Sequence, residues 1–292
     1  NYGVDFSGGR TYQVRFDQPV NTTDITESLS AAFVVEDGPA VRPEVKTFGG
    51  SNQVRITTKY RVDDKGIEVD EDIQNKLWAG VQGYFADPVE RDAFFNDDDN
   101  KAYGLMSSSQ VGPTIADDIR TSAIWSILFS LVVIFLYILI RFRKWQFSLG
   151  AVVAVFHDVL LVLSLFSLLY GFVPFSLEID QAFIAALLTV IGYSLNDTVV
   201  VFDRIREYLT IHPKRNFDEN VTSALNSTLS RTVNTSLTTL FVLLVIFFFG
   251  GETIRGFMFA LSVGVIVGTY SSVCIATPVM VDTLSRKFKG QE

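Results

Sequence analysis

The stretch GYSLNDTVVVFDRIRE, residues 192 to 207, places Asp197 beside Asn196 directly after an apolar run that is long enough to be part of a membrane span. An aspartate in the hydrocarbon core costs roughly 2.5 to 3.5 kcal/mol on insertion scales, so it persists mainly where it faces protein or water. Asp197 is therefore a candidate for carrying protons or ions through the membrane.

Two further polar positions can share a layer with Asp197. Asp158, which follows His157, and Arg231 both occur within other apolar runs. At a rise of about 1.5 Å per residue from the outer end of each span, Asp197, Asp158 and Arg231 lie about 22, 20 and 27 Å deep. A long arginine side chain covers a turn of helix, so Arg231 is a candidate partner for Asp197.

Asp197 has two interpretations. The first is a static salt bridge to Arg231, or to Arg204 further along its own helix, which fixes only the helix register. The second is a proton carrier: burial favours the neutral carboxyl group and a nearby arginine favours the charged one, so moving these groups apart or together would switch proton binding. For His157, a packed or hydrogen-bonded ring and a proton relay are both open.

The apolar run around Arg231 carries polar residues at three- and four-residue spacing, which places them on one helix face. We expect this polar face to look inward. Its members are Ser227, Arg231, Asn234, Thr235 and Thr238. The candidates for proton conduction are Asp197, Arg231, Asp158, His157, Asn196 and Asn234.

A second periodic face carries small residues. Ala260, Gly264, Gly268 and Ser272 recur every four residues in the last apolar run. Small side chains at this spacing let a neighbouring helix backbone approach closely. We interpret this face as a packing surface without chemistry of its own.

Five apolar windows are long enough to cross a hydrocarbon layer about 30 Å thick. They cover residues 122–140, 147–171, 180–202, 228–250 and 254–281. Lys and Arg accumulate in segments 141–146, 204–215 and 285–290, and such clusters favour the cytoplasmic side. We therefore expect a multi-pass membrane protein, with residues 1–120 extracytoplasmic, a transmembrane domain over 121–285 and a cytoplasmic tail over 286–292.

The N-terminal part is predicted to alternate strands and helices. Strands are expected over 11–17, 44–48, 52–60 and 102–112, with helices over 24–33 and 69–85. The order βαββαβ is that of a ferredoxin-like α+β domain, in which two helices cover one face of an antiparallel sheet. The acidic segment NDDDN, 96 to 100, lacks the ligand spacing of a calcium loop. The fold class is thus an α+β domain followed by an all-α bundle of five membrane helices.

Composition excludes several classes of function. The net charge is −8, and residues 1–120 alone carry 21 acidic and 12 basic side chains, so nucleic acid is an improbable partner. A single cysteine and the lack of a P-loop or a hydrolase cluster point to no cofactor, no metal and no enzymatic activity. Any work would draw on an ion gradient across the lipid bilayer or on a partner.

Four segments together resemble a known family. They are YGVDFSGGRTYQV (2–14), FHDVLL (156–161), GYSLNDTVVVFDRIRE (192–207) and SRTVNTSLTTL (230–240). They are similar to the signature segments of the SecF half of the SecDF protein-export membrane component, in the resistance-nodulation-division superfamily. The resemblance covers nearly the whole chain.

The resemblance implies a protein of the bacterial cytoplasmic membrane with six membrane helices and a ferredoxin-like domain between the first and second. It implies a role in protein export that uses the proton gradient, or sodium in some members, with the SecD half, the SecYEG channel with its SecA motor, the translocating preprotein and YajC as partners. Asp197 and Arg231 match the family residues implicated in proton conduction. The family's proton path also uses acidic residues of the SecD half.

The family's first membrane helix would precede Tyr2, so we expect either a truncated SecF or, by preference, the C-terminal piece of a fused SecDF chain. Asp5, Gly8 and Gly9 either turn the chain into the first strand, the favoured interpretation, or contact substrate. Two rival functions stay open: a scaffold for the SecYEG assembly, and an ion-driven exporter of small molecules or lipids from the same superfamily.

Overall fold

The computed structural model describes residues 2–34, 41–64, 66–96, 101–170, 172–173 and 175–289. The chain forms two compact units. The first contains residues 1–122, 170–181 and 251–253, and the second contains residues 123–169, 182–250 and 254–292. Each unit is described by itself.

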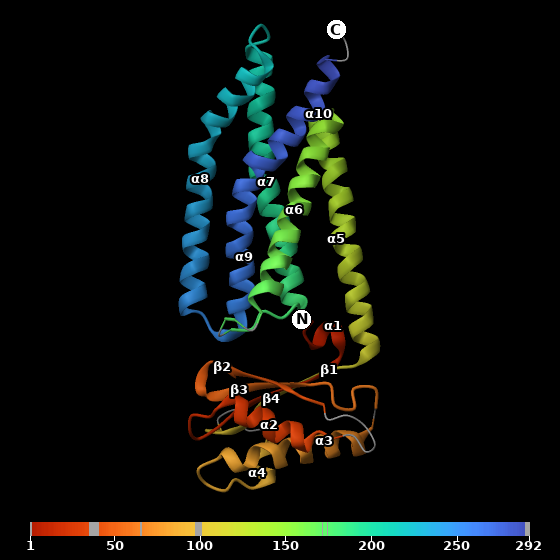
Figure 1. Ribbon diagram of the computed structural model, residues 1–292, viewed down its shortest axis with the longest axis vertical. Helices are drawn as coiled ribbons and strands as arrows, with labels where there is room; N and C mark the ends of the chain where they lie inside the picture. The colour runs from red at the N-terminus through yellow and green to blue at the C-terminus, as the bar shows by residue number, and fades with distance from the viewer. Residues whose placement is uncertain are drawn as a thin grey trace. The chain divides into compact units, whose positions relative to one another are not determined.

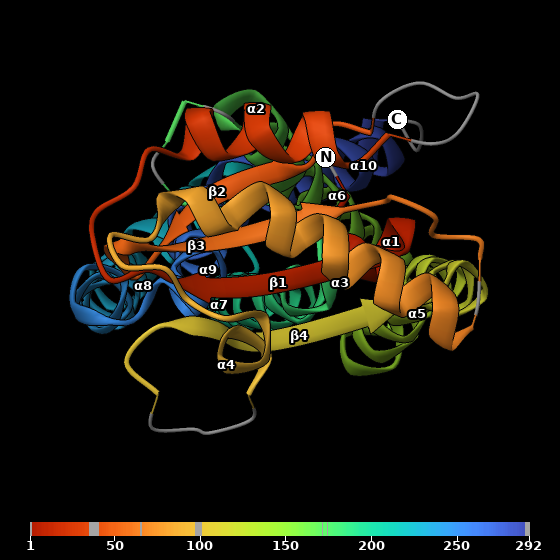
Figure 2. The same cartoon turned by 90° about the horizontal axis from the view of Figure 1, so that it is seen from below.

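The first unit is built on a four-stranded antiparallel sheet. Its strands are β1 (Gly9–Arg15), β2 (Glu44–Phe48), β3 (Gly50–Thr58) and β4 (Gly104–Val111), in the order β2-β3-β1-β4. Helix α2 (Thr22–Ala32) connects β1 to β2, and α3 (Ile67–Val81) connects β3 to β4. Both helices cover the same face of the sheet (Figure 2). This arrangement confirms the predicted ferredoxin-like βαββαβ order.

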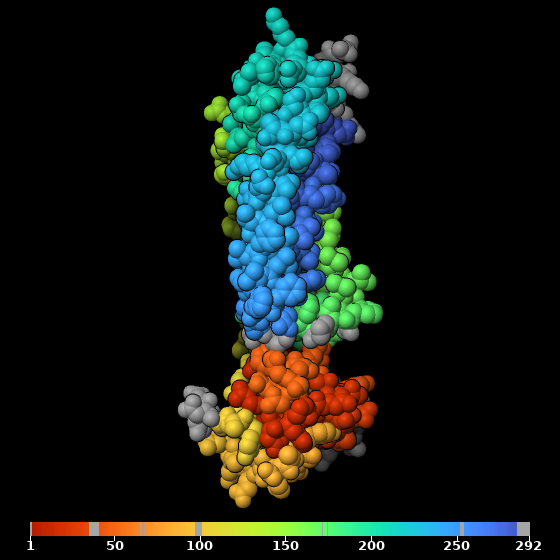
Figure 3. Space-filling model, turned by 90° about the vertical axis from the view of Figure 1, so that its left-hand side faces the viewer, coloured from red at the N-terminus to blue at the C-terminus, as the bar shows by residue number. Residues whose placement is uncertain are grey.

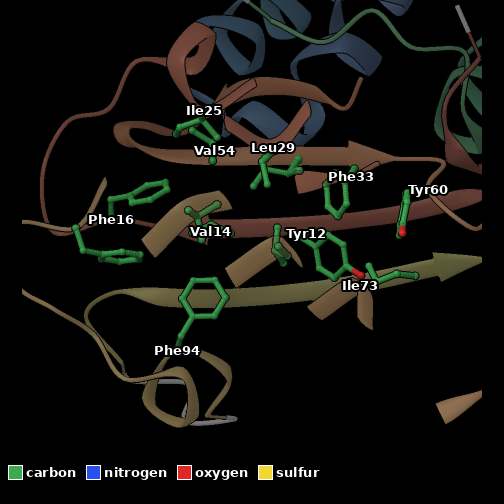
Figure 4. Packing of buried hydrophobic residues seen from close by; sticks show 14 of the residues in the cluster. Tyr12, Val14, Phe16, Ile25, Leu29, Phe33, Val54, Tyr60, Ile73 and Phe94 are labelled. Carbon is green, nitrogen blue, oxygen red and sulfur yellow. The ribbon is translucent and has the colours of Figure 1, made fainter. Parts of the chain in front are cut away.

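The apolar core of this unit lies between the sheet and its two helices (Figure 4). Alternate residues of β1 point into it, because successive side chains of a strand face opposite sides. Tyr12 and Val14 of β1 pair in register with Ile56 and Val54 of β3. The helices supply Ile25, Leu29, Ile73 and Leu77 at four-residue spacing, and Phe33 follows directly after α2.

Several short elements were not predicted. They are α1 (Val4–Ser7), a 3₁₀ turn (Gln82–Tyr84) and α4 (Arg91–Phe95). Helix α2 begins at Thr22, two residues earlier than predicted, because the Asn21 side chain accepts a hydrogen bond of 2.9 Å from the Thr23 N–H and caps the helix. The NDDDN segment lies outside the described residues from 97 to 100.

The segment 170–181 is fastened to β2 within the first unit. Lys46 of β2 forms ion pairs with Glu44 at 2.7 Å and with Glu178 at 3.4 Å. The Tyr170 hydroxyl donates a hydrogen bond to Glu44. Burial, with the added negative charge of Glu44 and Glu178, raises the pKa of Tyr170. These contacts make the segment a part of the sheet unit and not a separate loop.

The second unit is a bundle of long apolar helices (Figure 1). In the described residues five helices are long and apolar enough to cross a membrane, which confirms the predicted number of spans. They are α5 (Pro113–Phe142), α6 (Trp145–Leu169), α7 (Gln181–Ile211), α8 (Phe217–Phe249) and a last span, Ile254–Leu284.

The last span is divided into α9 (Glu252–Ser271), a π-helical turn (Ser272–Ala276) and α10 (Thr277–Lys289), and it changes direction at this point (Figure 1). Most helices extend beyond the predicted windows, since hydropathy marks the membrane-crossing part and not the polar turns at either end. Helix α8 covers one side of the bundle (Figure 3). Its outward apolar side chains include Phe241, Phe248 and Phe249.

Candidate functional site

Helix α7 buries Asp197 inside the bundle. Only 2% of this residue is exposed, and it shares its buried face with Ser194, Thr198 and Val201 at three- and four-residue spacing. The Ser236 hydroxyl on α8 donates a hydrogen bond of 3.4 Å to the Asp197 Oδ2 atom. A carboxyl group so placed has one hydroxyl partner among the described residues.

Ser236 is the centre of a small polar network. The Thr269 hydroxyl on α9 donates to the Ser236 Oγ atom at 2.6 Å. The Tyr193 hydroxyl on α7 lies 3.4 Å from Ser236 and 3.3 Å from the Thr239 hydroxyl. Hydroxyl groups both donate and accept, so a chain of this kind can pass protons between α7, α8 and α9.

A second buried carboxyl group, that of Asp158 on α6, is fully enclosed. Its Oδ2 atom accepts hydrogen bonds from Ser194 at 2.6 Å and from Ser271 at 2.8 Å. His157 Nδ1 lies 3.1 Å from Oδ1, and the half-buried His157 ring contacts the edge of Tyr270. Asp158 therefore joins α6, α7 and α9 through hydrogen bonds.

Arg231 does not form the ion pair with Asp197 that the depth comparison suggested. Among the described residues no ion pair within 4.0 Å involves Arg231. The Arg231 side chain is exposed. Arg204, the alternative static partner of Asp197, instead binds Glu207 at 2.7 Å and Ser227 at 3.0 Å.

Arg231 lines an open cleft of about 720 Å³ between α7 and α8, near the ends that their connecting loop joins. Charged and hydroxyl side chains dominate the walls of this cleft. Its lining residues are Val200, Asp203, Arg204, Arg206, Glu207, Thr210, Ile211, Ser227, Thr228 and Arg231. The cleft is open to solvent.

The polar face of α8 that was predicted to look inward is exposed in this chain, so that prediction is wrong. Ser227, Arg231, Asn234 and Thr238 are exposed, and Thr235 is half-buried. The buried polar face is offset by one position and consists of Thr228, Thr232 and Ser236. A shift of one residue turns a side chain by about 100°, which is enough to separate the two faces. Asn196 on α7 is also exposed.

The small residues of the last span lie where α9 meets α7. A Cβ atom at Gly264 would come within 2.0 Å of the Val190 side chain, and one at Gly268 within 2.8 Å of the Ser194 Cβ atom. Ala260 and Ser272 are fully buried, and Ser272 donates to the Thr269 carbonyl at 2.9 Å. These residues position helices and carry no titratable group.

The π-helical turn was missed, although Pro278 was a usable signal. Proline lacks an N–H and clashes with the carbonyl four residues earlier, here that of Cys274. The Thr277 hydroxyl donates to the Ser272 carbonyl at 3.0 Å across the turn. Ser271, the residue that binds Asp158, comes directly before it. Such turns inside helices are frequent at functional sites.

Asp5, Gly8 and Gly9 lie in the first unit. Gly8 and Gly9 have positive φ angles of 69° and 139°, and a Cβ atom at Gly9 would lie 2.8 Å from the Thr58 carbonyl oxygen. Asp5 Oδ2 accepts a hydrogen bond of 3.1 Å from the N–H of Gln181, the first residue of α7. Both glycines have backbone conformations that favour glycine, and Asp5 contacts the first residue of α7.

The described residues of the site offer groups that can transfer protons. In the part of the chain that the structure describes, no three or more His, Cys, Asp and Glu residues gather closely enough to hold a metal ion. The chemistry available is therefore that of two buried carboxyl groups, one histidine and several hydroxyls.

Two family models match this chain. The model described as protein export membrane protein SecD/SecF, C-terminal, matches residues 92–286, and the SecD/SecF GG motif matches residues 1–20. The second includes Asp5, Gly8 and Gly9.

Named relatives agree with these matches. The protein translocase subunit SecF of Rhodothermus marinus is 46% identical over 97% of this chain and 83% of its own length. That of Thermodesulfovibrio yellowstonii is 37% identical over 96% and 82%. The crystal structure of SecDF from Thermus thermophilus superposes with a TM-score of 0.76 at 31% identity, covering 98% of this chain and 34% of that one.

Proposed function

Because this chain belongs to the SecD/SecF family of protein-export membrane proteins, we propose that it is an accessory component of the Sec protein translocase that uses a proton gradient to promote late steps of preprotein translocation. The observation that carries the proton-driven role is the burial of Asp197 inside membrane-spanning helices, with one hydroxyl partner and without an ion pair among the described residues. A buried acid that is not locked in a salt bridge is free to exchange a proton.

Arg231 supports a switching role. It is exposed at the cleft and forms no ion pair with Asp197, so a movement of α8 that brings Arg231 closer would favour the charged carboxylate. A membrane potential supplies about 2.3 kcal/mol per charge per 100 mV. That energy suffices to bias two conformations that differ by a few kcal/mol.

We also propose an orientation of the chain in the membrane and a set of binding partners. The Lys- and Arg-rich ends of α5, α7 and α10 would face the cytoplasm, and the sheet unit would be extracytoplasmic. The partners would be a SecD half, the SecYEG channel, the translocating preprotein and YajC. Asp158, His157, Asn196 and Asn234 remain proposed members of the proton path, with Asp158 and His157 directly bonded to each other.

The test replaces Asp197 and Arg231 in the full natural protein together with its SecD counterpart. Asp197→Asn and Arg231→Met should insert and fold normally but abolish proton-dependent export and proton flux. Asp118→Asn, at an exposed position of α5, is the matched control and should leave both unchanged. Normal proton flux in the Asp197 variant would refute the proton-driven role. Loss of translocase assembly in both variants would favour a scaffold instead.

A further inference from the structure

Thr232 of α8 carries a buried hydroxyl group. Only 1% of the residue is exposed, and its Oγ1 atom has no hydrogen-bond partner in the described part of the chain. The neighbouring Thr228 donates to the carbonyls of Ala224 and Leu225, and Thr235 donates to that of Arg231. A buried hydroxyl without a partner is costly, so its retention needs an explanation.

The position of Thr232 gives one. Thr228, Thr232 and Ser236 are four residues apart on the buried face of α8, with about 6 Å of rise between successive members. Ser236 at one end of this ladder is bonded to Asp197. Thr228 at the other end lines the open cleft between α7 and α8. Along the axis of α8, Thr232 therefore lies between the residue that binds the buried Asp197 and the residue that lines the open cleft.

The cleft is suited to be the aqueous end of such a path. Its volume of about 720 Å³ holds many water molecules, and its walls carry arginine and carboxylate side chains. The unpartnered Thr232 hydroxyl can both donate to and accept from a water molecule. Buried waters typically occupy such unsatisfied polar positions.

We propose that Thr232 is a proton-relay residue that links Asp197 to the cleft, a step that rests on the proton-carrying role proposed for Asp197. The protonated Asp197 carboxyl gives its proton to a water bound at the Thr232 hydroxyl. This water passes a proton toward Thr228 and the cleft. Asp197 is left as a carboxylate, and the cleft water gains one proton, so charge and atoms balance.

The test compares variants at position 232 in the full natural protein with its SecD counterpart, reconstituted into vesicles that contain a pH-sensitive dye. Thr232→Val keeps the side-chain shape but removes the hydroxyl. We expect its proton flux to fall about tenfold, equivalent to about 1.4 kcal/mol on the barrier. Thr232→Ser should restore the flux. Thr238→Val, which removes an exposed hydroxyl already bonded to its own helix, should leave it unchanged.

Stability separates a relay from a structural role. Removal of an unpartnered buried hydroxyl should raise the thermal unfolding temperature of Thr232→Val while the flux falls. A variant with higher stability and normal flux would overturn the relay. If Asp197→Asn also conducts normally, the proposed function fails as well; if Asp197→Asn is inactive and Thr232→Val is normal, only the relay fails.

Water access gives a second measurement that does not depend on flux. In a Cys274→Ser background, the variant Thr232→Cys should react with a small charged thiol reagent. Reagent added on the side of the membrane where the α7–α8 loop lies should react faster than reagent added on the other side. No reaction in protein that is folded would overturn the relay, because no water would then reach position 232.

Discussion

Gly268 of α9 and Ser194 of α7 are in direct backbone-to-side-chain contact, so close that a Cβ atom at position 268 would lie 2.8 Å from that of Ser194. The Ser194 hydroxyl donates a 2.6 Å hydrogen bond to Asp158. Three helices thus meet at one point, and the missing side chain of Gly268 sets the distance at which Ser194 can hold the buried carboxyl group.

Replacement of Gly268 by alanine should therefore loosen the Asp158 cluster. The added methyl group forces α7 and α9 apart, and overpacking of this kind typically costs about 1 to 3 kcal/mol. Thermal unfolding in detergent measures the loss. Gly192→Ala is the matched control, because a Cβ atom there meets nothing within 4 Å and alanine is the better helix former. Equal melting temperatures for the two variants would contradict the close contact.

Pro278→Ala should regularise the last span. Alanine restores an N–H that can donate to the Cys274 carbonyl and removes the clash that favours the π-helical turn, Ser272–Ala276. We expect slower hydrogen exchange of the backbone amides over 272–282 and a gain of up to about 3 kcal/mol in unfolding free energy. Pro113→Ala, at the first position of α5, should show neither effect, since that N–H has no partner within the helix.

The sheet unit was predictable because its signal is local. Tyr12, Val14 and Phe16 alternate toward the core, and the pattern of strand and helix periods leaves one common arrangement, βαββαβ. Helix ends were less predictable. Helix α7 continues to Ile211 through charged residues that form ion pairs within the helix, such as Arg204 with Glu207 at 2.7 Å. Such pairs stabilise a helix but do not raise its hydropathy, so a hydropathy window ends before them.

The candidate site was predictable only in part. An acid within an apolar run marks Asp197 and Asp158, but their partners come from other helices, and no spacing in the sequence connects Asp158 with Ser271. Two polar faces on α8 differ by one residue position. Which of them faces the bundle is decided by packing, in this case by the contact of Ser236 with Asp197.

Asp5 should stabilise the start of α7. Its carboxylate accepts a hydrogen bond of 3.1 Å from the Gln181 N–H, as a helix cap does. Its negative charge also interacts favourably with the positive N-terminal end of the helix dipole. Asp5→Ala should cost about 1 kcal/mol and speed hydrogen exchange at residues 179–182. Asp5→Asn, which keeps an acceptor, should lose less. Asp63→Ala, at an exposed position of the same unit, is the control, and an identical exchange pattern in all three variants would rule out the cap.

The sheet unit should lose stability in strong alkali through Tyr12, a buried residue of β1. Burial raises the pKa of Tyr12 from 10.0 to about 12, with the nearby Asp70 adding to the effect and Arg10 opposing it. Between these two pH values the unfolded chain releases the phenolic proton while the folded chain keeps it, so unfolding is favoured as the pH rises.

Each pH unit in this window removes about 1.4 kcal/mol, and the loss stops above the folded-state pKa of about 12. Below pH 10 the phenol is neutral in both states, and Tyr12 then adds no pH dependence. Thermal unfolding of the full chain, followed by circular dichroism at pH 9 and pH 11, should show a steeper decline for the natural protein than for Tyr12→Phe. Parallel declines would contradict the prediction. They would mean that the pKa of Tyr12 is the same in the folded unit and in the unfolded chain.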